Sequence, residues 1–346
     1  MSGVRRRRLA RDDEATARGN AGSRGLMPAL PGFFSRAPTR SILYRSLFRS
    51  AIVLAVLSTV LTSCLSPESR PAGAPVALDE HGQPASLLSA FFGLDGDLPL
   101  FARLLLCRGA AGTDGMPVVL SHTIDAQTLA AEDFRVFTRS GAETAPLCVT
   151  LQPAMDEGEG RTVLLIGEFG DAEEDPPVKV EVVGELLSDG ATGGPVSFRG
   201  KAIEVTPLEA GPSLVLAEVI PVEQRSTSGR GSACPPDTPQ VVRVTWAGGV
   251  SPPSGTDAGA IERAPYRVTV ERAGGQREEI TPAAIADLGD NDNNHHLCLD
   301  TRDPAISVSF PAGQLVDPNQ DLNPATKLRI KPGPGGHGRD AAKRHG

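Results

Sequence analysis

The sequence predicts an all-β protein built from two β-sandwich domains in tandem. Many short runs rich in Val, Ile, Leu and Thr are separated by Gly, Pro, Asp and Asn, a pattern typical of short strands joined by turns. The chain has 38 Gly and 30 Pro but only 4% aromatic residues, so aliphatic side chains must supply the core. Removing the first 63 of 346 residues leaves 283. That length is enough for two domains of ordinary size.

The segment that precedes these domains has the features of an export signal. Four arginines come before the apolar run 51–61: Arg36, Arg40, Arg45 and Arg49. A basic region, a short apolar region and small residues before a cleavage point define such a signal. A membrane-spanning helix needs about 20 apolar residues. The run is shorter than that, so we expect residues 1–63 to be a removed leader, starting at Met1 or Met27.

The end of this leader, Leu61-Thr62-Ser63-Cys64, resembles the lipobox of bacterial lipoproteins. The resemblance implies that Cys64 becomes the first residue of the mature chain and carries a diacylglycerol and an acyl chain such as palmitate. It also implies a lipid bilayer as partner. Leu65 in place of Asp favours the outer membrane, with the body facing the periplasm or the cell surface. The alternative is an ordinary secretory signal cut nearby, with Cys64 incidental.

Cleavage before Cys64 changes the charge of the protein. The whole chain has 34 basic and 42 acidic residues, and residues 1–63 contain 11 Arg against 3 acidic residues. The remainder therefore has 23 basic and 39 acidic residues, a formal charge of −16. Nucleic-acid binding needs clustered Lys and Arg, so this composition argues against a nucleic-acid partner.

Four cysteines remain after Cys64, an even number that suggests disulfides in an exported protein. They are Cys107, Cys148, Cys234 and Cys298. Four cysteines allow three connectivities. We expect Cys107–Cys148 and Cys234–Cys298, because these pairs keep each bridge within one proposed domain.

In chain order, residues 64–84 are rich in Pro, Ala and Ser and predict a tether. Residues 85–210 form the first predicted sandwich. Within it, the apolar segment 85–94 predicts a short amphipathic helix, and segment 98–107 predicts either a helix or a strand. Further strands are expected over 118–122, 145–151, 162–166 and 178–186.

A motif in the first domain carries a second resemblance. Ile124-Asp125 is followed by Thr128-Leu129 and then by Asp133-Phe134-Arg135-Val136. This order resembles the bacterial Ig-like domains of S-layer and cell-surface proteins, over roughly residues 117–187. Asp125 is expected to bond its own turn, Leu129 to close the end of the sandwich, and Phe134 and Val136 to alternate into the core.

Residues 211–330 form the second predicted sandwich, and residues 331–346 a disordered tail. Strands are expected over 213–219, 241–246, 266–270, 277–280 and 327–330. Five pairs of segments align with the first domain, which suggests a divergent duplication. The pairs are 134–137 with 266–269, 140–141 with 274–275, 149–154 with 279–283, 156–160 with 287–291, and 178–182 with 306–310.

The densest polar segment is a candidate calcium site. Asp287, Asp290, Asp292 and Asn294 supply the oxygen ligands that calcium prefers. The spacing is not that of an EF-hand, because the sixth position from Asp290 is His295 rather than Gly. The alternative is a loop closed by Asx turns. No other cofactor is predicted, and His295-His296 with Cys298 is a weak candidate for zinc or copper.

No catalytic or cofactor-binding motif stands out in this sequence. It lacks the motifs of serine hydrolases, zinc proteases, P-loop proteins and dinucleotide-binding proteins, so we predict that it is not an enzyme. The predicted function is a structural, adhesive or ligand-binding module of the cell envelope with an unknown protein or glycan partner. The alternative is a carbohydrate-binding or accessory lipoprotein, which needs Trp246 and Tyr266 on one exposed face.

Overall fold

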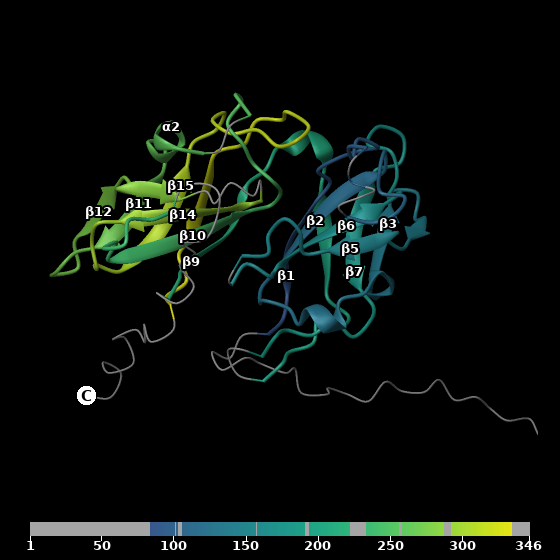
Figure 1. Ribbon diagram of the computed structural model, residues 1–346, viewed down its shortest axis with the longest axis horizontal. Helices are drawn as coiled ribbons and strands as arrows, with labels where there is room; N and C mark the ends of the chain where they lie inside the picture. The colour runs from purple at the N-terminus through teal and green to yellow at the C-terminus, as the bar shows by residue number, and fades with distance from the viewer. Residues whose placement is uncertain are drawn as a thin grey trace, which may run out of the picture. The chain divides into compact units, whose positions relative to one another are not determined.

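The computed structural model describes residues 84–333, except 101, 103–105, 157, 191–193, 222–232, 256–257 and 287–291. Residues 69–346 form one compact unit. The predicted leader, Cys64, most of the tether and the tail beyond residue 333 lie outside the described residues. Within the described part, no helix has the length and apolar character needed to span a membrane. Strands dominate, which confirms the all-β prediction (Figure 1).

The first sandwich contains strands β1 to β8, hydrogen-bonded in the order β4-β3-β7-β8-β1-β2-β6-β5. Their bounds are Leu87–Phe91 (β1), Asp114–Leu120 (β2), Phe134–Thr138 (β3), Glu143–Thr144 (β4), Cys148–Thr150 (β5), Thr162–Gly167 (β6), Pro177–Val182 (β7) and Ala202–Thr206 (β8). The first half of β8 pairs antiparallel with β7, and its last residues pair in parallel with β1. This strand therefore joins the two layers of the sandwich.

Strand β1 corrects the prediction of an amphipathic helix over 85–94. The segment 87–91 pairs with β2 on one side and β8 on the other. Ala90 and Phe91 are both fully buried, although they point to opposite faces of the strand. A run buried on both faces does not alternate between apolar and polar residues, so its pattern does not distinguish a strand from a helix. In the neighbouring segment 98–107, the amide of Leu106 donates to the carbonyl of Ala102, a helical spacing.

The second sandwich consists of two four-stranded sheets, β13-β14-β10-β9 and β12-β11-β15-β16. The bounds are Leu214–Val219 (β9), Gln240–Trp246 (β10), Arg267–Glu271 (β11), Arg277–Ile280 (β12), Ala284–Ala286 (β13), Asn294–Leu299 (β14), Ala305–Phe310 (β15) and Thr326–Arg329 (β16). A short helix, α2, spans Ala260–Arg263. Lys331, just past β16, forms a parallel bridge with Glu218 of β9.

The two sandwiches have the same strand order. Subtracting eight from each strand number of the second sandwich reproduces the sheets β5-β6-β2-β1 and β4-β3-β7-β8 of the first. Three of the five predicted segment pairs fall on equivalent strands or turns, and the pair 156–160 with 287–291 lies partly outside the described residues. The pairing of 149–154 with 279–283 is wrong, because 149–150 belong to β5 whereas 279–280 belong to β12. Repeated topology supports the predicted duplication.

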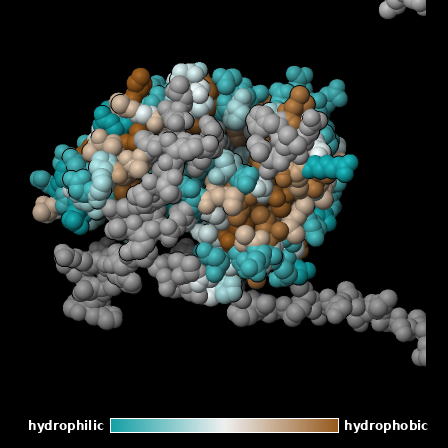
Figure 2. All heavy atoms as spheres, in the orientation of Figure 1, coloured by the Kyte–Doolittle hydropathy of each residue, from teal (hydrophilic) through white to brown (hydrophobic). Residues whose placement is uncertain are grey.

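Each sandwich encloses its own hydrophobic core. In the first, Phe134 and Val136 point inward and are fully buried, and Leu129 packs against the same cluster. Asp125 accepts a hydrogen bond from the amide of Gln127, and Thr128 accepts one from the amide of Leu187. The 124–136 motif therefore folds as its residue types predicted. Figure 2 shows a hydrophobic area, in brown, over the part of the first sandwich where Figure 1 labels β5 and β6.

The sheet β13-β14-β10-β9 is buried on both faces. Every residue of β10 and of β14 is buried, including those that point away from the second core. Beyond the end of β10, a Cβ atom added to Gly248 would lie 2.7 Å from Cδ1 of Phe91 in the first sandwich. Only glycine fits this approach without displacing a fully buried ring. This sheet therefore packs against the first sandwich as well as against its own core.

Candidate functional site

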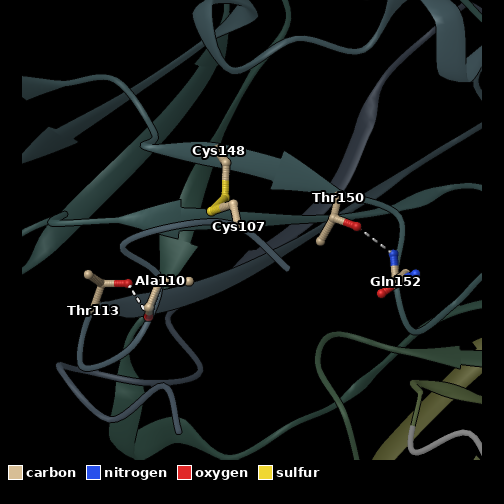
Figure 3. Close-up of a disulfide and its surroundings, with 6 residues drawn as sticks. All are labelled: Cys107, Ala110, Thr113, Cys148, Thr150 and Gln152. Atoms are coloured by element: carbon tan, nitrogen blue, oxygen red, sulfur yellow. Dashed lines mark hydrogen bonds between the residues drawn. A yellow bond between two sulfur atoms is a disulfide. The ribbon is translucent and has the colours of Figure 1, made fainter. Parts of the chain in front are cut away.

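Both predicted disulfides are present, one in each sandwich. Cys107 bonds to Cys148 with Cα atoms 6.6 Å apart, and Figure 3 shows this bond beside the Thr113–Ala110 hydrogen bond. Cys234 bonds to Cys298 with Cα atoms 5.6 Å apart. Each bridge starts in the connection between the first two strands of its sandwich. The first ends on β5 and the second on β14, so the bridges are not equivalent by topology.

The candidate calcium site is only partly within the described residues, because Asp287 and Asp290 lie outside them. Asp292 accepts hydrogen bonds from the backbone amide and the side-chain amide of Asn294, at 2.7 and 2.6 Å. The side-chain oxygen of Asn294 accepts from the Thr245 hydroxyl at 2.7 Å. Among the described residues, no group of three His, Cys, Asp or Glu side chains is arranged to hold a metal ion. Calcium binding stays a prediction.

The two aromatic residues that would form a sugar platform are both inside the second core. Trp246 and Tyr266 have 0% exposure. The indole N–H of Trp246 donates to the Tyr266 hydroxyl at 3.2 Å, and that hydroxyl lies 2.9 Å from Nδ1 of His295. Phe310 packs against both rings. Neither side chain is available to stack on a sugar.

The three histidines within the described residues, His122, His295 and His296, occupy structural positions. His295 points into the second core toward Tyr266, and His296 points to the opposite face of β14, toward Glu159 of the first sandwich. Cys298 is used in a disulfide, which removes the third member of the weak zinc or copper candidate. In the first sandwich, Nδ1 of His122 lies 2.8 Å from the hydroxyl of Ser121, and its ring meets Phe198 edge-on.

Five charged or titratable side chains meet where the doubly buried sheet contacts the first sandwich. We call them the buried charge cluster: Glu159, Arg161, Glu218, Arg243 and His296. In the sheet register, Arg243 of β10 lies opposite Glu218 of β9 on one side and opposite His296 of β14 on the other. Glu159 and Arg161 come from the loop that leads into β6.

Glu218 is the centre of this cluster. Its Oε1 atom lies 2.8 Å from Nη2 of Arg243 and 3.2 Å from Nη2 of Arg161. Oε1 of Glu159 lies 3.5 Å from Nε2 of His296. The carboxylate of Glu218 therefore lies between two guanidinium groups, one from each sandwich.

The electrostatics of the cluster follow from its burial. Loss of water raises the pKa of Glu218, but Arg161 and Arg243 outweigh this effect and hold that pKa below its ordinary value. Burial lowers the pKa of the Arg161 guanidinium, and Glu218 opposes that change. Removing one partner from such a group leaves a buried charge without compensation. The ionised glutamate is thus required to hold the two arginines together.

The cluster has the residue types of an acid–base site but not the access. The side chains of Glu159 and His296 are only 2% and 5% exposed. A substrate could not reach them, so the arrangement joins structural elements instead of performing chemistry. The sequence contained one signal for it: Arg243 interrupts the otherwise apolar run 241–244, where a charge must find a buried partner. The partners of Arg243 were not predictable, because they depend on the register of the sheet and on the contact between the two sandwiches.

Burial also raises the pKa of three carboxylates among the described residues: Asp114 and Asp133 in the first sandwich and Asp317 in the second. Burial raises the pKa of Asp114 to about 6, although its carboxylate accepts hydrogen bonds from the amides of Phe169 and Gly96. Burial likewise raises the pKa of Asp317 to about 6, against a hydrogen bond from the amide of Asp321. Asp114 and Asp317 both brace loops, and neither was predicted as a site.

Searches against protein-family models and against curated proteins found no match for this chain.

Proposed function

We propose that the protein is a membrane-anchored extracytoplasmic lipoprotein whose body is a structural, adhesive or ligand-binding module of the cell envelope. The two disulfides carry this proposal. Such bonds form and persist in oxidising compartments and are rare in reducing ones. One bridge in each sandwich agrees with export directed by the basic and apolar leader, with Cys64 as the attachment point to an outer membrane.

The strand order supports the Ig-like part of the proposal. Lettered in chain order, with β4 and β12 as extra edge strands C′, each sandwich has strands A, B, E and D in one sheet and C, F and G in the other. This is the order of constant-type immunoglobulin domains. Such a fold presents loops and sheet faces on a rigid frame, which suits binding and scaffolding.

The doubly buried sheet supports a rigid body rather than two domains on a flexible linker. Its outward row of Glu218, Arg243 and His296 contacts Glu159 and Arg161 of the first sandwich. In a rigid body of this kind, the membrane anchor fixes where the other end of the body lies. The alternative of a carbohydrate-binding lipoprotein with an aromatic platform is less well supported, because Trp246 and Tyr266 are both buried.

A Cys64→Ala variant tests the anchor in the native host. We expect the wild-type chain in the membrane fraction, labelled by a fatty acid, and the variant in the soluble extracytoplasmic fraction without label. The matched control is Ser63→Ala, which keeps a small residue before the cysteine and should stay membrane-bound. Membrane retention of the Cys64→Ala variant would contradict the proposed anchor.

A further inference from the structure

The outer face of the sheet β12-β11-β15-β16 carries a group of basic side chains that the proposed function does not use. We call it the basic face: Arg267, Arg277, Lys327 and Arg329, all exposed. Register brings them together, since Arg267 and Lys327 flank Ser309, and Arg329 lies opposite Ser307. Two acidic residues, Glu271 and Glu279, share this face, so four basic and two acidic residues give it a formal charge of +2.

The cations of the basic face are not neutralised locally. Among the described residues, no ion pair joins Arg277, Lys327 or Arg329 to a carboxylate. Arg272, beside the same face, shows the contrast, because it pairs with Glu278 at 2.7 Å and with Asp303 at 2.6 Å. Three cations without a carboxylate partner lie on one sheet face of a body with a charge of −16, so they are available to pair with a bound anion.

The same face is hollowed. The pairing of β11 with β15 changes register between Thr269, opposite Ser307, and Val270, opposite Ala305, so it skips Ile306. Such a β-bulge bends a sheet. A hollow of about 420 Å³ lies here, lined by Arg277, Lys327 and Arg329 together with the hydroxyls of Thr269 and Ser307. Glu279 also lines it, which disfavours an anion at that edge.

A second hollow, of about 530 Å³, adjoins the first. Its lining includes Arg267, Ser309 and Thr326, and Lys327 lines both hollows. The basic residues and hydroxyls therefore follow one another across the sheet instead of surrounding a single point. An extended ligand with repeated negative charges fits this layout better than one small anion.

The equivalent face of the first sandwich lacks this arrangement. On β4-β3-β7-β8, Arg135 pairs with Glu143 at 3.1 Å and Lys179 with Glu181 at 3.0 Å. Lys179 also lies 3.8 Å above the Phe137 ring. With Glu204, this face has two basic and three acidic residues, a formal charge of −1. The fold does not require an unpaired basic face, so its presence in one copy indicates a use.

We propose that the basic face binds an extended anionic polysaccharide bearing sulfate, phosphate or carboxylate groups. This inference rests on the proposed role as an envelope module and names its ligand class. Guanidinium groups donate paired hydrogen bonds to such anions, and the serine and threonine hydroxyls suit sugar hydroxyls. The face has no exposed aromatic ring to stack nucleic-acid bases. Nor does it have an exposed large hydrophobic side chain to insert into a bilayer, since the exposed apolar residues of its lining are Pro311 and Ala325.

Binding of dextran sulfate to the full chain, at low and physiological salt, tests the proposal. We expect dextran sulfate to bind and neutral dextran not to bind, with an affinity that falls as salt screens the charges. Lys327→Gln removes the cation shared by both hollows and should weaken binding about fivefold. The triple variant Arg277→Gln, Lys327→Gln, Arg329→Gln should weaken it about 30-fold or more.

The matched control is the double variant Arg135→Gln, Lys179→Gln on the first sandwich, which should bind dextran sulfate like the wild type. An equal loss in this control, or full binding by the triple variant, would overturn the assignment. Binding to phosphatidylglycerol vesicles without binding to dextran sulfate would replace the polysaccharide with a membrane surface. Melting temperatures check that the variants fold. If the triple variant does not fold, the single variant Lys327→Gln still tests the proposal. Membrane attachment through Cys64 is measured separately, so failure here leaves the anchor proposal intact.

Discussion

On the first sandwich, the outer face of β4-β3-β7-β8 sets its two cations against carboxylates, whereas the equivalent face of the second sandwich leaves three cations unpaired. The inner sheet faces have the same role in both sandwiches, because each pair of faces encloses a hydrophobic core. The common strand order fixes which positions face outward. The residue types at those positions decide whether the cations of a face are paired with carboxylates of the protein or left available for a ligand.

Ion pairs offer a related comparison, because the pair Arg135–Glu143 on the outer face is exposed, whereas the pairs of Glu218 with Arg161 and Arg243 are buried. The largest expected effect is therefore from Glu218→Ala. It leaves Arg161 and Arg243 buried without their carboxylate, and we expect the free energy of unfolding to fall by about 3–5 kcal/mol. Urea denaturation measures this change.

Glu143→Ala is the matched control, since it breaks the exposed pair with Arg135. We expect a loss of no more than about 0.5 kcal/mol. Equal losses in the two variants would mean that the buried charge cluster does not hold the two sandwiches together.

The disulfides offer a second comparison between the copies. Cys107 and Cys148 are 41 residues apart, and Cys234 and Cys298 are 64 apart. Replacing either pair with serine should lower the free energy of unfolding by about 2–4 kcal/mol, with the larger loss for the longer loop. Denaturation of the two double variants under oxidising conditions measures both. A smaller loss for the 234–298 pair would show that local packing outweighs loop length.

The pH dependence of stability should be shared by the two copies. Folding raises the pKa of Asp114 and Asp317 to about 6, from an ordinary value of 3.8. Between these values the folded chain binds more protons than the unfolded chain, so stability rises as pH falls from 7 to 5. We expect a gain of about 1 kcal/mol for each carboxylate. Glu218 acts oppositely, because its pKa is lowered and its contribution is lost in more acidic solution.

Melting temperatures between pH 4 and pH 8 test this balance. Asp317→Asn keeps the acceptor for the amide of Asp321 but does not titrate, so the gain between pH 7 and pH 5 should shrink by about 1 kcal/mol. A melting temperature that falls steadily from pH 7 to pH 5 in the wild type would contradict the raised pKa values.

Local patterns predicted most strands, both disulfides and the motif around Phe134. They failed where tertiary contacts decide the structure. The segment 85–94 resembles a helix because both faces of β1 are buried, a fact that depends on distant residues. Arg267, Arg277, Lys327 and Arg329 are spread over 63 positions, from 267 to 329 in the sequence. Only the pairing of β11, β12, β15 and β16 brings them onto one face.

The parallel pairing of first and last strands has a mechanical consequence. β1 runs beside the end of β8, and β9 runs beside Lys331 after β16. Tension on the two ends of either sandwich pulls these neighbours in opposite directions along their length. The hydrogen bonds between them are then loaded together in shear instead of opening one at a time. Each sandwich would therefore resist stretching between its two chain ends at this seam.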